Sequence, residues 1–312
     1  MRDFIDENYL FGEIKIWSDS GVRKDSVGIL VEAKSDEKLY RKFIVSKAIF
    51  FIGNGFKNVE KAIESVNKHK IQGVLGIIDA DFKRIEKAII PKNLFLTDFH
   101  DKEMMILNSV AWKSILFQFS DNSISSKTGF SKLQKFEKQV NLSVLEAILK
   151  ASKSIANIRL LNERNAFGLK FKEEKTKKGK KSFEHIKYED FINNKTLKVD
   201  EEKLQKAVEN KSQKLGFFSN LETQKQIEII KSETYDLMEL CNGHDVINIF
   251  VFALREAIGS EKNKNSIDRI TAEQIETHLT TAYRLEDFQK TDLYTSLLKW
   301  ESMNLPYALF LF

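Results

Sequence analysis

Short apolar runs alternate with segments of helical periodicity over the first third of the chain. The apolar runs at 27–32, 48–52, 73–78 and 94–97 are bounded by turn-forming residues and predict buried strands. The segments between and after them predict helices at 37–45, 58–68, 84–89 and 101–119. Such alternation is typical of a mostly parallel sheet with helices on its faces. We therefore predict an α/β fold built on a four-stranded, mostly parallel sheet.

The pattern changes after about residue 120, so we predict a first region at 1–120, with its core at about 25–120, and a second region at 121–312. The second region is expected to be mainly helical. Its predicted helices lie at 133–161 (in two pieces), 201–214, 221–232, 244–258, 271–282 and 291–300.

Alternating polar and apolar residues at 169–172 and 183–188 flank a lysine-rich segment. This pattern predicts a β-hairpin at about 168–190 with a basic tip. Lysines at the tip are candidates for binding a nucleic-acid backbone, and a solvated tip is the alternative. The lysines concerned are Lys177, Lys178, Lys180 and Lys181.

Acidic residues follow three of the four predicted strands. They are Glu32 and Asp36, then Asp79 and Asp81, then Asp101 and Glu103. Because the carboxyl ends of parallel strands share one edge of a sheet, we expect these side chains to converge. Clustered carboxylates repel one another unless a cation lies among them, and their hard oxygen atoms suit Mg²⁺ or Mn²⁺. The pattern therefore predicts a metal or phosphate site.

Helix capping is an alternative explanation for part of this set. Asp36, Asp101 and Glu103 stand where helices are expected to begin, and Ser35 or Asp36 could cap the first helix. Glu32 and Asp79 differ because each ends a very apolar strand, where a charge is costly without a partner. The prediction of a metal or phosphate site depends mainly on these two residues.

Composition adds little to this picture. The net charge of +5 and the pI of about 8.9 are weak evidence for a polyanionic partner, because the chain is rich in lysine throughout. A single cysteine, Cys241, excludes an internal disulfide and a cysteine-rich zinc site. No apolar run approaches a membrane span, and no signal-peptide core is evident, so we expect a cytoplasmic protein that does not enter a membrane.

The segment Ile29–Asp36, together with Ile77–Asp81, resembles the Toprim domain of topoisomerases, primases and OLD-type nucleases. The Toprim signature is a Glu after one strand and an Asp-x-Asp after a later one. Thr97–Met105 and Asn242–Val246 resemble a bacterial family that includes the AriB-type effectors of the PARIS anti-phage system. The resemblance implies a Toprim-like, Rossmann-type fold over about 25–120. Ala33 departs from the signature, which usually has Gly after the Glu.

The resemblance also implies a function. The chain would be a metal-dependent nuclease that uses Mg²⁺ or Mn²⁺, with tRNA favoured over DNA as substrate, acting as a toxic effector in defence. It would form a homodimer and work beside an ABC-type ATPase of the AriA type.

Site residues are implied as well. Glu32, Asp79 and Asp81 would be catalytic and would bind metal together with Asp36, and Asp101 and Glu103 would be ligands or their supports. His244 is our candidate for an electrophilic role at the phosphate, and the alternative is that His244 is a bystander while Asp245 caps its helix. Lys34 and Lys83 flank the acidic positions and are candidates for contacting nucleic acid.

Two other functions fit parts of the sequence. Asp79-Ala80-Asp81 is similar to the nucleophile motif of haloacid-dehalogenase-like phosphatases, but that motif follows the first strand and is followed by Thr, whereas Phe82 stands here. A catalytically inactive sensor or adaptor with a Toprim-like shell is the non-enzymatic alternative.

Overall fold

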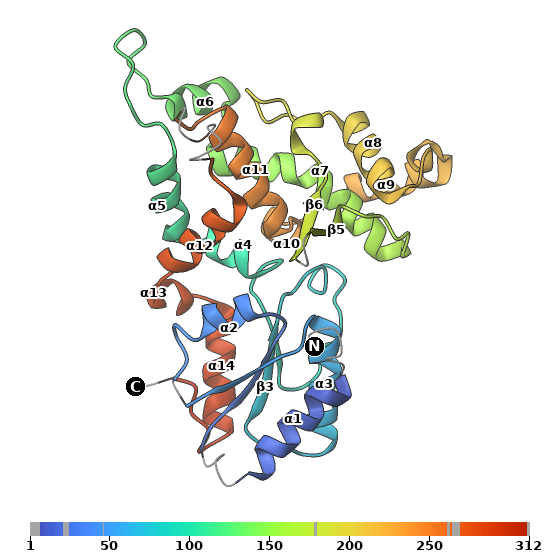
Figure 1. The fold of residues 1–312 in the computed structure, drawn as a ribbon, viewed down its shortest axis with the longest axis vertical. Helices are drawn as coiled ribbons and strands as arrows, with labels where there is room; N and C mark the ends of the chain where they lie inside the picture. Colours follow the sequence, from blue (N-terminus) through green and yellow to red (C-terminus); the bar gives the residue numbers. More distant parts are fainter. Residues whose placement is uncertain are drawn as a thin grey trace. The chain divides into compact units, whose positions relative to one another are not determined.

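The computed structural model describes residues 7–20, 25–45, 47–177, 180–260, 263 and 269–310, and it describes no side chain at residue 7 or at 174–183. The chain divides into two compact units (Figure 1). One unit contains residues 1–110 and 280–312, and the other contains residues 111–279. The boundary thus falls earlier than residue 120, and the C-terminal segment belongs with the N-terminal unit.

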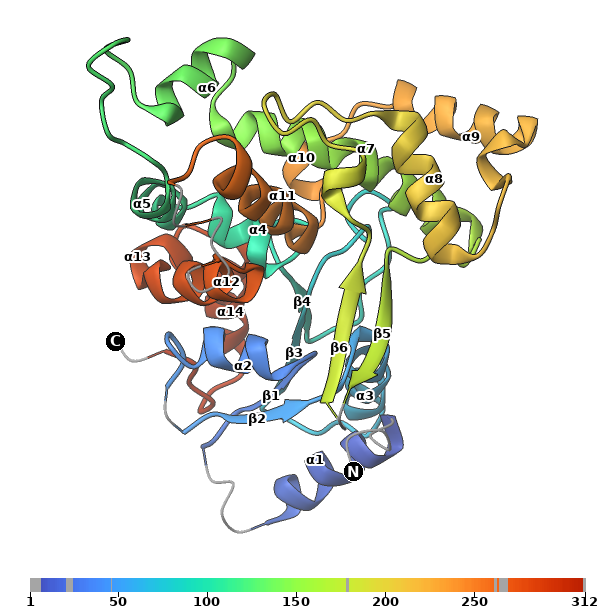
Figure 2. The same ribbon diagram turned by 45° about the horizontal axis from the view of Figure 1, so that its top comes forward.

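The first unit contains a four-stranded parallel sheet with strand order β2-β1-β3-β4 (Figure 2). The strands are β1 (Gly28–Val31), β2 (Ile49–Ile52), β3 (Val74–Ile78) and β4 (Leu94–Leu96). Each matches a predicted apolar run, so the predicted α/β class and the parallel sheet are confirmed. The central strands β1 and β3 are buried along their whole length, which explains why they are continuously apolar.

Helices cover both faces of this sheet. α1 (Glu7–Asp19) and α3 (Phe56–Lys68) lie on one face, while α2 (Lys34–Tyr40) and α14 (Asp292–Met303) lie on the other (Figure 1). The core between the sheet and α1 and α3 is formed by side chains at helical spacing, such as Val59, Ile63 and Val66, packed against Leu30 and Ile78 of the strands.

A glycine marks the entry to α3. Gly55 has φ +119°, a conformation that residues with a side chain rarely adopt, and it is the N-cap of the helix. Its N–H donates to the backbone carbonyl of Glu32 at 3.2 Å. The turn after β2 is therefore tied to the end of β1.

Two predicted helices of this unit differ in the structure. The predicted helix at 84–89 is absent: residues 84–87 form turns and 88–89 are irregular. Lys87 takes a left-handed φ of +50°, which an α-helix does not contain, and the Arg84 guanidinium donates to the Thr97 carbonyl at 2.8 and 3.0 Å. The helix predicted at 101–119 is two helices, α4 (Lys102–Leu107) and α5 (Val110–Phe119). The interruption at 108–109 lies just before the boundary between the units, which falls after Val110, so nearly all of α5 belongs to the second unit. The sequence did not predict α1.

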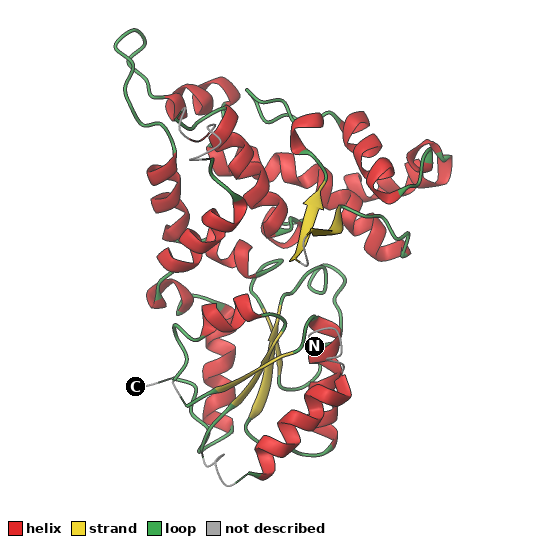
Figure 3. Ribbon diagram, viewed as in Figure 1, coloured by secondary structure: helices red, strands yellow, loops and turns green. Residues whose placement is uncertain are grey.

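The second unit is mainly helical (Figure 3). The 22-residue α7 (Val144–Asn165) packs against α6 (Lys132–Val140), α9 (Leu221–Ser232), α10 (Leu237–Leu240) and α11 (Gly243–Glu256). The second unit also contains α8 (Glu201–Ser212) and nearly all of α5, with the 3₁₀ turns η2 (Tyr188–Asp190) and η3 (Phe217–Ser219). α12 (Ala272–Ala282) begins in this unit and runs into the first one, which also contains α13 (Leu285–Phe288).

The predicted hairpin is present in the second unit. Strands β5 (Lys172–Lys177) and β6 (Lys180–His185) pair antiparallel, with Lys177 opposite Lys180 (Figure 2). Lys178 lies outside the described residues, as do the side chains of Lys177, Lys180 and Lys181. Their role in binding nucleic acid stays a prediction.

Within the described part of the chain, no helix has both the length and the hydrophobicity that crossing a membrane would require.

Candidate active site

Glu32 and Asp79 meet at the carboxyl ends of the two central strands. β1 and β3 are paired in register, with Val31 opposite Ile77, so the residues just beyond them are neighbours. The backbone N–H of Asp79 donates to Oε1 of Glu32 at 2.8 Å. The structure therefore brings together the two residues on which the sequence argument most depends.

Burial has a strong effect on Glu32. It raises the pKa of this carboxyl to about 7, against an ordinary value of 4.5. The hydrogen bond from Asp79 opposes this change, the charges of Asp81 and Asp36 add to it, and the charge of Lys83 opposes it. Glu32 is thus a carboxyl that exchanges its proton near neutral pH.

Asp79 is in a similar environment. Its Oδ1 accepts a hydrogen bond from the backbone N–H of Lys102 at 3.0 Å. Burial raises its pKa well above the usual range; Lys102 opposes this effect, whereas the carboxylates of Glu103, Asp101 and Asp36 reinforce it. Two neighbouring strand ends therefore carry carboxyl groups whose charged forms are destabilised.

Lys102 lies among these acidic residues, and the sequence argument missed it. Its Nζ is 2.9 Å from Oδ1 of Asp36 and 2.9 Å from Oε1 of Glu103. The Lys102 side chain is only 11% exposed. Burial alone would lower its pKa, but the surrounding carboxylates of Glu103, Asp36 and Asp79 outweigh burial and raise it. No local sequence pattern indicated this position, because the burial of Lys102, shared by every residue of α4, is visible only in the structure.

Two of the acidic residues also have capping roles. Oδ1 of Asp101 accepts the N–H of Met104 at 2.9 Å, so Asp101 is the N-cap of α4. Asp36 is at the third position of α2, and its Oδ2 accepts the N–H of Ala33 at 2.8 Å. The prediction that Ser35 or Asp36 is the N-cap of α2 is wrong, because Ala33 has that position. Ala33 has φ −141°, an ordinary extended conformation that does not need glycine.

Asp81 lies two residues beyond Asp79 in the loop that follows β3. It has a left-handed φ of +46°, and its N–H donates to the carbonyl of His100 at 2.6 Å. Its side chain is 40% exposed, with Nε2 of His100 and Nζ of Lys83 each 3.8 Å from a carboxylate oxygen. Asp81 thus presents a carboxylate to solvent beside the buried pair.

The two predicted nucleic-acid lysines near this edge differ in their surroundings. Nζ of Lys83 lies 3.9 Å from the ring centre of Phe56 and 3.8 Å from Oε1 of Glu60, and the side chain is 13% exposed. Lys34 is 61% exposed and pairs with Glu37 on the same helix. Lys83 is the lysine that acts electrostatically on Glu32.

His244 and Asp245 belong to the second unit, at the start of α11. Asn242, not Asp245, is the N-cap of this helix. Asp245 is buried and binds Arg159 through two contacts of 2.6 and 2.9 Å, and the Tyr188 hydroxyl donates to it at 3.0 Å. The capping alternative for Asp245 is therefore wrong, because its side chain serves a buried ion pair.

The exposed His244 places Nδ1 3.0 Å from Oε1 of Glu276. Its role at a phosphate stays a prediction, since it and the acidic residues belong to different units.

No group of three or more His, Cys, Asp or Glu side chains is positioned to hold a metal ion within the described residues. Between Asp36 and Glu103 the structure has the ammonium of Lys102, whose distance of 2.9 Å to an oxygen of each carboxylate is that of an ion pair. The assignments of metal ligands therefore remain predictions.

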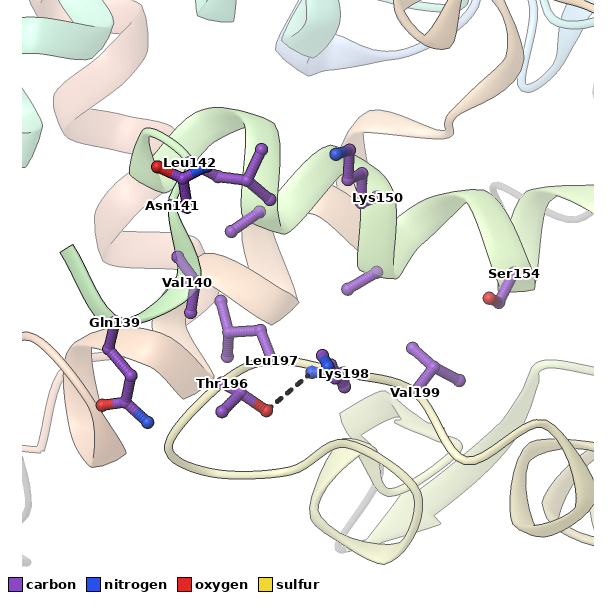
Figure 4. A pocket seen from close by; sticks show the side chains of 12 residues that line it. Gln139, Val140, Asn141, Leu142, Lys150, Ser154, Thr196, Leu197, Lys198 and Val199 are labelled. Atoms are coloured by element: carbon purple, nitrogen blue, oxygen red, sulfur yellow. Dashed lines mark hydrogen bonds between the residues drawn. The ribbon is translucent and has the colours of Figure 1, made fainter. Parts of the chain in front are cut away.

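A pocket of about 730 Å³ lies in the second unit, between the start of α7 and the loop at 196–199 (Figure 4). It is lined by Leu142, Lys150, Leu197 and Lys198, among others. None of the residues predicted for the acidic site lines it.

Neither a protein-family model, nor a curated protein, nor a solved structure matches this chain.

Proposed function

We propose that the first unit is the catalytic part of a metal-dependent nuclease of Toprim type, which cleaves phosphodiester bonds in nucleic acid. The observation that most supports this proposal is the direct contact between Glu32 and Asp79 at the carboxyl ends of β1 and β3. Ligands of open parallel sheets bind at this edge. Carboxylates at such an edge can supply the charge and the ligands that phosphodiester hydrolysis requires.

The chemistry of the donor set fits a divalent cation. The oxygens of Glu32, Asp79 and Asp81 are hard ligands of the kind that Mg²⁺ and Mn²⁺ prefer. Burial raises the pKa values of Glu32 and Asp79, so a cation bound beside them would stabilise their ionised forms. These three residues would hold the ion. When bound, the ion would lower the pKa of a water molecule and neutralise charge at the scissile phosphate.

The protein's own groups have separate roles in this proposal. The N–H of Asp79 orients Glu32, which would act as a ligand of the ion or as a general base that accepts a proton from water. The backbone N–H of Lys102 orients Asp79 in turn. Lys83, beside Asp81, supplies a positive charge that can contact a phosphate oxygen.

The wider context is proposed from the family resemblance. We propose tRNA as the favoured substrate and DNA as the alternative, and a role as a toxic effector in anti-phage defence. A toxic nuclease needs restraint, which an ABC-type ATPase partner would provide. A homodimer would allow two active sites to act on one substrate.

The proposal is tested by incubating the purified full chain with tRNA and with plasmid DNA, in the presence of Mn²⁺, Mg²⁺ or EDTA. Cleavage should require a divalent ion and should be lost in Asp79→Asn, which keeps an oxygen for the Lys102 N–H. Glu222→Gln, an exposed acidic residue in the first turn of α9, is the matched control and should cleave normally. Absence of cleavage with every ion, alongside retained partner binding, would instead favour the sensor or adaptor.

A further inference from the structure

The acidic cluster contains a cation that belongs to the chain itself. Lysine is rarely buried unless it is paired, and Lys102 is the first residue of α4, where the helix dipole disfavours a positive charge. The positive charge of Lys102 therefore has to be stabilised by negative charges nearby. The carboxylates of Asp36 in α2 and Glu103 in α4 stabilise this charge, each with an oxygen 2.9 Å from Nζ.

These contacts divide the carboxylates into two groups. Asp36 and Glu103 are neutralised by an ammonium at hydrogen-bond distance. Glu32 makes its described contact with a backbone N–H, and Asp79 contacts Lys102 through the backbone N–H rather than through the ammonium. Asp81, on the exposed side, has Nζ of Lys83 and Nε2 of His100 each 3.8 Å from a carboxylate oxygen. Lys102 thus pairs directly with Asp36 and Glu103, whereas its described effect on Asp79 is electrostatic.

We infer that Lys102 is a built-in counter-cation that takes the place of one divalent ion, so that this site binds a single Mg²⁺ or Mn²⁺ on the side of Glu32, Asp79 and Asp81. The ion count rests on the proposed function, whereas the counter-cation role does not. An ammonium and a divalent ion repel each other, and both would need the oxygens of Asp36 and Glu103. Lys102 therefore excludes a second ion from this position and also fixes α2 to α4.

The test replaces Lys102 by methionine, a flexible neutral side chain. Asp36 and Glu103 then lack their cation, and removing one partner of a buried pair is strongly destabilising. Without divalent ions, Lys102→Met should lower the thermal midpoint by on the order of 10 °C. Adding Mn²⁺ should restore most of this loss, because the ion now enters between the two carboxylates.

Mn²⁺ binding, followed by calorimetry and by electron paramagnetic resonance, supplies the second readout. Wild type should bind one ion per chain, and Lys102→Met should bind one more. The double variant Lys102→Met with Asp36→Asn removes one of the two carboxylates. It should regain stability without metal and should lose the additional ion.

The outcomes separate this inference from the proposed function. A wild type that binds two ions and cleaves nucleic acid overturns the inference and leaves the nuclease intact. A wild type that neither binds Mn²⁺ nor cleaves overturns the nuclease, while rescue of Lys102→Met by Asp36→Asn still supports the counter-cation.

Unchanged stability and unchanged Mn²⁺ binding in Lys102→Met would contradict the inference. If Lys102→Met does not fold, the neutral triple variant with Asp36→Asn and Glu103→Gln decides. If the triple variant recovers a stable fold, the inference is supported, and if the triple variant does not fold, the inference is overturned.

Discussion

The backbone N–H of Asp79 donates a 2.8 Å hydrogen bond to Oε1 of Glu32, which joins the ends of the two central strands of the sheet. Because the donor is a backbone group, its position is fixed by β3 and does not depend on a side-chain rotamer. Glu32 is thereby held in one orientation while burial raises its pKa. The same contact that fixes the carboxyl also limits how far its pKa rises.

Glu32 should make the metal-free protein less stable as the pH rises. Its pKa changes from 4.5 to about 7 on folding, so between these values the folded chain holds a proton that the unfolded chain has released. Stability contributed by this proton is present below the lower pKa and is lost as the pH rises through the higher one, by at most about 3 kcal/mol. Denaturant unfolding at pH 5 and pH 8 measures this loss.

Glu32→Gln is the matched control for this titration, because its side-chain oxygen can still accept from Asp79. We expect the variant and wild type to be similar at pH 5, and the variant to be the more stable protein at pH 8. A stability difference that does not change with pH would mean that Glu32 titrates normally.

Lys83 and Lys34 should contribute unequally to cleavage. Lys83→Ala removes a partly buried charge beside Asp81, and we expect kcat/KM to fall by about tenfold or more. Lys34→Ala removes an exposed charge paired with Glu37, and we expect a change of less than about threefold. Steady-state kinetics on one nucleic-acid substrate at fixed salt compares them. Equal losses would show that net charge matters at this edge and that the position of Lys83 does not.

Asp245 should be essential to the second unit's stability. Asp245→Ala leaves the Arg159 guanidinium and the Tyr188 hydroxyl without their shared acceptor, at an expected cost of about 3–5 kcal/mol. The neighbouring His244→Ala, at an exposed position, should change stability by less than about 1 kcal/mol. Equilibrium unfolding gives both values. A mild effect of Asp245→Ala would show that the buried pair is dispensable.

The parts of the fold that were predictable are those determined by local pattern. β1 and β3 are buried on both faces, so their continuous apolar runs were unambiguous, and the acidic residues that follow them had to lie at one edge of a parallel sheet. The helical face of Val59, Ile63 and Val66 was similarly clear.

The parts that were missed depend on contacts between distant segments. The role of Lys102 requires α2 and α4 to lie in contact, which no local sequence pattern predicts. Residues 280–312 join the first unit through contacts such as Oδ2 of Asp98 with the N–H of Asp292 at 2.8 Å. Residues 84–89 do not form the predicted helix, and the Arg84 side chain there donates to the distant Thr97 carbonyl. In each case tertiary contacts override local propensity.

The most direct test of the central claim is the cleavage rate of Glu32→Gln relative to wild type, on tRNA and on plasmid DNA with Mn²⁺. Gln keeps the shape of the side chain and its acceptor for the Asp79 N–H, but it cannot bind an ion as a carboxylate or accept a proton. We predict a rate loss of at least about 100-fold with the fold retained. Cleavage at the wild-type rate by a folded Glu32→Gln protein would contradict the assignment of this site.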